Sequence, residues 1–91
     1  MGAEPLAPIV DGATPLAQSR MTRLYDALCH APSGGLETRS LSDRTGISHR
    51  EAHRLLARME GEGLVWSSLE YPPVESSRTG VVRMWRRTGA A

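Results

Sequence analysis

A short run of arginine and histidine residues follows a Gly-Ile-Ser turn at residues 46–48, and its side chains could recognise nucleic acid. The run contains His49, Arg50, His53, Arg54 and Arg58. One arginine can hydrogen bond guanine O6 and N7 together, and arginine also binds backbone phosphates. These residue types therefore indicate DNA recognition.

A helix that starts at Ser48 would position these side chains. The Ser48 hydroxyl can accept from the backbone N–H of Glu51, and the Glu51 carboxylate can reach back to the N–H of Ser48, which is a reciprocal capping box. Four apolar residues recur at helical spacing and can pack inward, which leaves the basic residues exposed. They are Ala52, Leu55, Leu56 and Met59. The pattern predicts a helix from Ser48 to about Glu62, with Gly63 after it, whose basic face suits the major groove.

Three further arginines are candidates for contacts with DNA. Arg39 and Arg44 flank a predicted second helix, where each is either a phosphate contact or a solvated charge. Arg78 lies among small residues in a predicted loop, so its guanidinium could enter a minor groove or bind a phosphate. The complete set of predicted DNA-binding residues is Ser48, His49, Arg50, His53, Arg54, Arg58, Arg39, Arg44 and Arg78.

The 91-residue chain is long enough for one small domain, and its formal net charge is only +1. The charges are unevenly distributed along the chain. Residues 1–38 contain two arginines and four acidic residues, whereas residues 39–91 contain nine arginines and six acidic residues. The basic excess therefore coincides with the predicted turn and DNA-reading helix.

The whole pattern predicts an α+β fold of three helices followed by a β-hairpin. In chain order, the expected elements are a flexible arm at residues 1–13, a first helix from a Thr14-Pro15 cap to Ala31, a short extended stretch at Leu36, a second helix from Thr38 to Thr45, the helix from Ser48, and strands at residues 64–71 and 81–86. The folded domain is expected to span residues 14–91.

Several side chains are expected in the core. The first helix has an apolar stripe made of Leu16, Met21, Leu24, Tyr25 and Leu28. Trp66 and Trp85 are expected to be cross-strand neighbours that pack on the helices. The phase of the last strand stays open, since either Val82 and Met84 or Val81 and Trp85 could face inward.

Three helices followed by a hairpin form the layout of the winged helix-turn-helix. Residues 21–66 resemble the MarR and ArsR pattern, with Glu62-Gly63-Leu64-Val65 as the clearest local match, and residues 84–89 resemble the end of the PadR hairpin. The resemblance implies a bacterial transcriptional regulator that binds double-stranded DNA with sequence specificity, and we expect a repressor. Its hairpin, the wing, would contact the DNA backbone or minor groove.

A homodimer is expected, because palindromic half-sites one helical turn apart are the usual way for small helix-turn-helix modules to gain affinity. MarR and PadR proteins usually continue into a C-terminal dimerisation helix, whereas this sequence stops at Ala91. We therefore expect the contact on the arm and first helix. The apolar candidates are Leu6, Ile9, Val10 and Leu16.

The sequence contains no Ser-His-Asp arrangement, Gly-rich phosphate loop or metal cage that would predict an enzyme. His49 and His53 have zinc-compatible spacing, but only the distant Cys29-His30 pair could complete the ligand set, so no metal or other cofactor is expected. Cys29 is expected to pack in or beside the core. A lone cysteine and the lack of a long apolar stretch favour a cytoplasmic protein, and the expected DNA binding would place it with the nucleoid.

A second class of function fits the same layout. The chain could be a winged-helix module that contacts protein, or an accessory part in plasmid or phage DNA maintenance. Electrostatics distinguishes the two. A continuous positive patch over the reading helix and wing favours DNA, whereas a mixed patch in which Glu51, Glu60 and Glu62 surround exposed apolar area favours protein.

Overall fold

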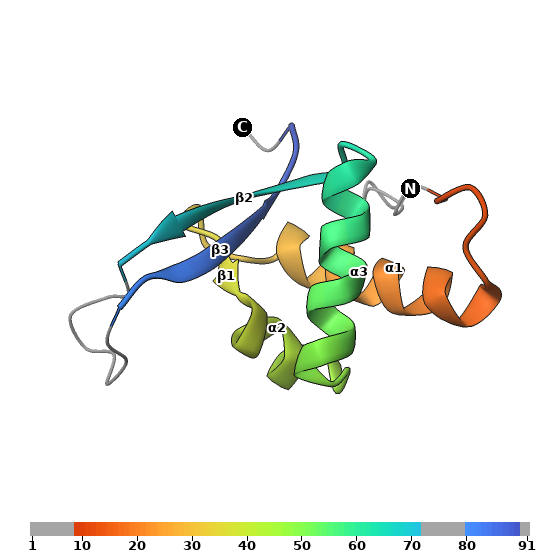
Figure 1. The fold of residues 1–91 in the computed structure, drawn as a ribbon, viewed down its shortest axis with the longest axis horizontal. Helices are drawn as coiled ribbons and strands as arrows, with labels where there is room; N and C mark the ends of the chain where they lie inside the picture. Colours follow the sequence, from red (N-terminus) through yellow and green to blue (C-terminus); the bar gives the residue numbers. More distant parts are fainter. Residues whose placement is uncertain (1–8, 72–79, 90–91) are drawn as a thin grey trace.

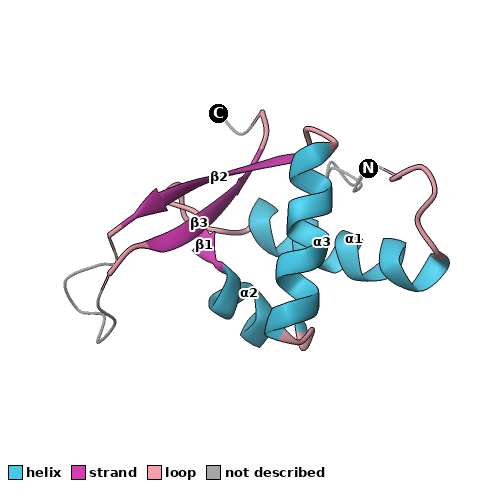
Figure 2. Ribbon diagram, in the orientation of Figure 1, coloured by secondary structure: helices cyan, strands magenta, loops and turns pink. Residues whose placement is uncertain are grey.

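A computed structural model describes residues 9–71 and 80–89, which form three helices and one antiparallel sheet of three strands (Figure 1). The elements are α1 (Pro15–Cys29), β1 (Leu36–Glu37), α2 (Thr38–Thr45), α3 (His49–Gly61), β2 (Val65–Glu70) and β3 (Val82–Arg87). The helices gather at one end of the molecule, and the β2–β3 hairpin extends away from them (Figure 2). This arrangement confirms the predicted α+β class and adds one strand to the predicted hairpin.

Helix α1 begins at the predicted cap. The Thr14 hydroxyl accepts from the N–H of Ala17 at 3.1 Å, and Pro15 occupies the first helical position. The buried stripe is Ala17, Met21, Leu24, Tyr25 and Leu28. Leu16 was expected in this stripe but is 58% exposed, because it is one residue, or about 100° around the helix, away from Ala17.

The turn between α2 and α3 is held by one glycine and one buried side chain. Gly46 ends α2 with a φ of 75°, a left-handed conformation that favours glycine. Ile47 then packs into the core, and the Ser48 hydroxyl accepts from the N–H of Glu51 at 3.2 Å. The predicted helix start at Ser48 is therefore confirmed.

Helix α3 ends in a Schellman motif, which sends the chain into the sheet. The N–H of Gly63 donates to the carbonyl of Glu60 at 3.0 Å, and the N–H of Leu64 donates to the carbonyl of Met59 at 2.9 Å. Gly63 has a φ of 77°. It therefore follows the helix as predicted.

The sheet has the strand order β1-β3-β2, so β3 is central. The short extended stretch predicted at Leu36 is β1, and Leu36 pairs with Trp85. Gly35 is required just before it, because a Cβ there would lie 2.5 Å from the carbonyl oxygen of Trp85. The sheet is thereby tied to the start of α2.

The two tryptophans face different environments. Trp85 is 1% exposed, and its Nε1 donates to the hydroxyl of buried Thr38 at 2.8 Å, so it is the residue of β3 that faces the core. Trp66 is 46% exposed and pairs with Arg86, whereas Ser67 is the residue opposite Trp85. The prediction of two neighbouring core tryptophans is wrong for Trp66, because successive residues of a strand point to opposite faces.

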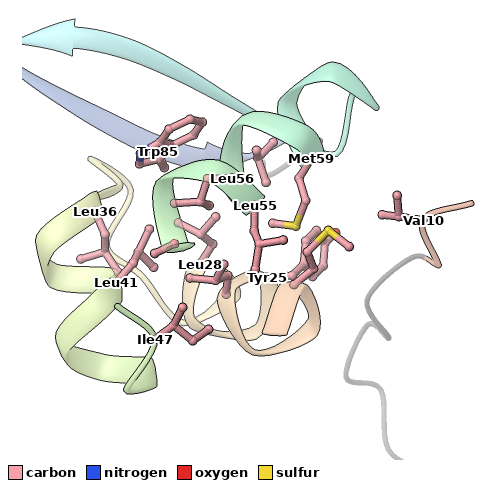
Figure 3. Close-up of a cluster of buried hydrophobic side chains, with 14 of the residues drawn as sticks. Val10, Tyr25, Leu28, Leu36, Leu41, Ile47, Leu55, Leu56, Met59 and Trp85 are labelled. Carbon is pink, nitrogen blue, oxygen red and sulfur yellow. The ribbon is translucent and has the colours of Figure 1, made fainter. Parts of the chain in front are cut away.

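The start of the described chain is attached to the helices. Val10 is 3% exposed, and its N–H donates to Oε1 of Gln18 at 2.8 Å. Figure 3 shows Val10 at the edge of the core cluster, on the side of Tyr25 and Met59. Packing therefore begins before Thr14, and Val10 is not available as the exposed dimer contact that was predicted. Leu6 and Arg78 lie outside the described residues.

Candidate nucleic-acid interface

Helix α3 has one buried strip and three accessible ones. Ala52, Leu55, Leu56 and Met59 face the core as predicted. Helical geometry places Arg50, Arg54 and Ala57 on the opposite side, and these three are exposed. We call them the outer strip. It is the part of α3 that could enter a groove of DNA.

The edge of α3 next to the hairpin carries His49, His53 and Glu60. The His53 ring meets Trp85 edge-on, with ring centroids 5.9 Å apart. The Glu60 carboxylate accepts from the N–H of Ser67 at 3.2 Å and from its hydroxyl at 2.8 Å. These contacts tie α3 to the hairpin, and they engage Glu60 within the protein.

The other edge of α3 faces α1 and the N-terminal segment. Arg58 donates to the carbonyl oxygen of Asp11 at 3.2 Å. Arg20 of α1 donates to Oε2 of Glu51 at 3.3 Å. The structure thus places Arg58 at the edge of α3, away from the outer strip.

Glu51 and Arg54 form a bidentate ion pair on the first turns of α3. Arg54 Nε donates to Oε1 at 2.9 Å, and Arg54 Nη2 donates to Oε2 at 2.7 Å. The hydrogen bond from Arg54 is the main reason that the pKa of Glu51 is lowered, and the same bond raises the pKa of Arg54. The second half of the predicted capping box is therefore wrong, because the Glu51 carboxylate binds two arginines instead of the N–H of Ser48.

Four predicted cationic or titratable side chains are exposed around α2 and the start of α3. They are Arg39, Arg44, His49 and Arg50. None makes an ion pair or side-chain hydrogen bond with another residue in the described ranges 9–71 and 80–89. The guanidinium charges of Arg39, Arg44 and Arg50 are therefore not neutralised by a described acidic side chain, and exposed cations of this kind suit phosphate.

A groove of about 230 Å³ lies between the start of α3, the β1–α2 junction and the loop end of β3, and Glu37 is one of its lining residues. Three predicted residues lie along it, namely Arg39, His49 and His53, and Arg83 joins them from β3. Arg83 lies over the Trp85 ring at 5.9 Å and donates to the Ser67 hydroxyl at 2.8 Å. Arg44 and Arg54 are not part of this groove.

Two arginines near the groove and the α2–α3 turn were not among the predicted DNA-binding residues. Arg83 could have been found from strand alternation only if the phase of β3 had been known, since it shares a face with Trp85. Arg23 donates from α1 to the carbonyl oxygen of Thr45 at 2.9 Å, beside the turn. No local signal connects Arg23 with that turn, because 22 positions separate the two residues.

The described ranges contain no cluster of three or more histidine, cysteine or acidic residues with metal-site geometry. Cys29 is half-buried and packs against the core cluster, as expected. None of the described helices is both long and apolar enough to cross a membrane.

Comparison with known proteins assigns the chain to no family. No protein-family model matches it, and no curated protein shows significant sequence similarity to it.

Proposed function

We propose that this chain is a winged helix-turn-helix transcriptional regulator that binds double-stranded DNA with sequence specificity. In this proposal α3 enters the major groove, and the β2–β3 hairpin acts as a wing against the backbone or minor groove. The observation that carries the proposal is that Arg39, Arg44, His49 and Arg50, on α2 and the first turn of α3, are all exposed and make no hydrogen bond or ion pair with another described residue. A dimeric repressor is the form we expect.

The distribution of acidic groups on α3 supports DNA as the partner. The outer strip contains two arginines and an alanine and no acidic residue. Arg54 and Arg20 neutralise Glu51, whereas Glu60 accepts hydrogen bonds from Ser67 at the edge next to the hairpin and keeps its charge, and Glu62 is exposed after the last turn of α3. A phosphate backbone approaching the strip would therefore meet mainly positive charge.

A protein-binding module is the second candidate, and one observation favours it. Four large apolar residues in or beside the hairpin are exposed, and they are Trp66, Leu69, Tyr71 and Val81. An exposed apolar group of this kind can mark a protein contact. In that case the hairpin, rather than the outer strip of α3, would be the binding surface. The same module could serve plasmid or phage DNA maintenance as an accessory part.

Selection of bound sequences from random duplex DNA, with the whole chain as bait, separates the two candidates. We expect a consensus site that contains inverted half-sites about one helical turn apart, as a dimer requires. The control is the double variant Arg50→Ala with Arg54→Ala, which removes the outer-strip cations and should lose the consensus. A parent protein that enriches no sequence would contradict the proposed function and leave the protein-binding module as the better account.

A further inference from the structure

We infer that Glu51 is a positioning residue that holds Arg54 in a fixed orientation for reading one guanine. The inference rests on the proposed function, because it specifies how one residue of the outer strip would contact a base. It is carried by the chain of side chains Arg20, Glu51 and Arg54, which joins α1 to the exposed side of α3.

The hydrogen bonds of Arg54 use only one edge of its guanidinium group. Glu51 occupies the side edge, where Nε and Nη2 each donate one N–H. A guanidinium has five N–H donors in a planar fork, so the end edge keeps one N–H on Nη1 and one on Nη2, which point in parallel away from the side-chain stem. Arg54 binds no other described residue. Its end edge is therefore free.

The free edge matches a particular hydrogen-bond pattern in the major groove. Guanine presents two adjacent acceptors there, N7 and O6, and a pair of parallel N–H donors binds both. Adenine presents one acceptor and one donor at the same positions, so the second N–H of Arg54 would face a donor. An arginine that presents its end edge to a base in the major groove therefore prefers guanine.

Glu51 can hold Arg54 because it is itself held. Its side chain is only 22% exposed, whereas that of Arg54 is 60% exposed. Arg20 reaches Oε2 from α1 at 3.3 Å, and the Ser48 hydroxyl accepts the backbone N–H of Glu51 at 3.2 Å. The carboxylate is thus fixed from the core side, while Arg54 covers it on the outer side. Two arginines and one carboxylate leave this cluster with a net positive charge, so it still attracts DNA.

The orientation of Arg54 would be less defined without Glu51. A free arginine side chain has many rotamers, and ordering it on binding costs free energy that a pre-formed ion pair has already supplied. Loss of Glu51 should therefore reduce discrimination at one base pair. The loss of Glu51 should not reduce the general attraction to DNA, because it removes a negative charge from α3.

The test compares Glu51→Gln with Glu60→Gln, since each removes one carboxylate from α3 but only Glu51 contacts Arg54. Titrations with the whole chain use the selected duplex and duplexes changed at one guanine at a time. At one guanine we expect Arg54→Ala to lose about tenfold in discrimination and Glu51→Gln about threefold. Glu60→Gln should keep the parent preference. Each variant should still be folded at the temperature of the titration, which its thermal melt checks.

A double variant shows whether Glu51 acts through Arg54. Glu51→Gln combined with Arg54→Ala should discriminate no worse than Arg54→Ala alone, because the positioned side chain is already gone. Arg20→Gln should reproduce part of the loss seen with Glu51→Gln. Unchanged base preference in Glu51→Gln, in a parent that prefers its selected site, would overturn this inference alone. A parent with no preferred site would overturn the proposed function together with it.

Discussion

Arginines of this chain differ in what already binds them, and that difference predicts different roles on DNA. Arg50 and Arg44 have no hydrogen-bond or ion-pair partner among the described residues, whereas Arg54 is paired with Glu51 and Arg58 donates to a backbone carbonyl. An unpaired exposed arginine is adaptable. A paired one is oriented, which favours readout of a base over contact with phosphate.

Arg44→Ala tests the phosphate role. Arg44 lies in the last turn of α2, outside the outer strip, and we expect it to contact the DNA backbone. The variant should bind all duplexes more weakly and lower the salt slope by roughly one unit, with its sequence preference intact. Titrations at several salt concentrations measure this. A selective loss on the preferred duplex would instead assign Arg44 to a base.

The ion pair of Glu51 should be visible in its titration. Because its folded pKa is lowered, the pair contributes stability that is present above the unfolded pKa and is lost as the pH falls through the folded pKa. Thermal melting from pH 7 to pH 3 should show a smaller acid loss for Glu51→Gln than for the parent. Equal losses in both proteins would show that the pair is not formed in solution. Glu70→Gln serves as the comparison. The pKa of Glu70 is also lowered, first by its hydrogen bond with Ser68 and then by its hydrogen bond with Arg86.

At the scale of elements, short-range sequence signals predicted α3 well. They did not predict contacts between residues that are far apart in the chain. The Ser48 cap, the apolar stripe and Gly63 all act within a few residues, so the sequence contains them directly. The exposure of Trp66 depends on the register between β2 and β3. The Glu51 cluster depends on Arg20, which is 31 positions away. Neither could be read from a local pattern.

Leu55→Ala tests whether the interface depends on the core beneath α3. Leu55 is fully buried, so the variant should lose about 2–5 kcal/mol of unfolding free energy and weaken DNA binding as well. Leu69→Ala makes the same chemical change at an exposed strand position and should stay within about 0.5 kcal/mol of the parent. Denaturant titration distinguishes the two. A stable Leu55→Ala variant would mean that α3 packs differently from the structure described here.

At the scale of the whole molecule, exposed apolar residues lie in two places, a surface near the start of α1 and the hairpin, where Trp66 and Leu69 are on opposite faces of β2. Ile9 and Leu16 are exposed near the start of α1, and Trp66, Leu69, Tyr71 and Val81 are exposed in or beside the hairpin. The first surface retains two of the predicted dimer contacts, after Val10 is assigned to the core. We therefore expect self-association through the start of α1, and DNA contact through α2, α3 and the hairpin.

Leu16→Ser should shift the protein from dimer to monomer without lowering its melting temperature, because this side chain is mostly exposed within one chain. Light scattering at micromolar concentrations measures the mass. Leu69→Ser, on the hairpin, is the matched control and should remain dimeric. A parent that is monomeric both free and on DNA would contradict the dimer, and a dimer lost only in Leu69→Ser would move the contact to the hairpin.

Binding of Arg50→Ala to the selected duplex and to a scrambled duplex tests sequence-specific recognition by α3 most directly. Arg50 is exposed on the outer strip and has no ion-pair or hydrogen-bond partner among the described residues, so its removal should leave the melting temperature unchanged. The parent should prefer the selected duplex, and Arg50→Ala should lose about 1–3 kcal/mol of that preference. If the parent binds both duplexes equally, or if Arg50→Ala keeps the full preference, α3 does not read DNA as proposed.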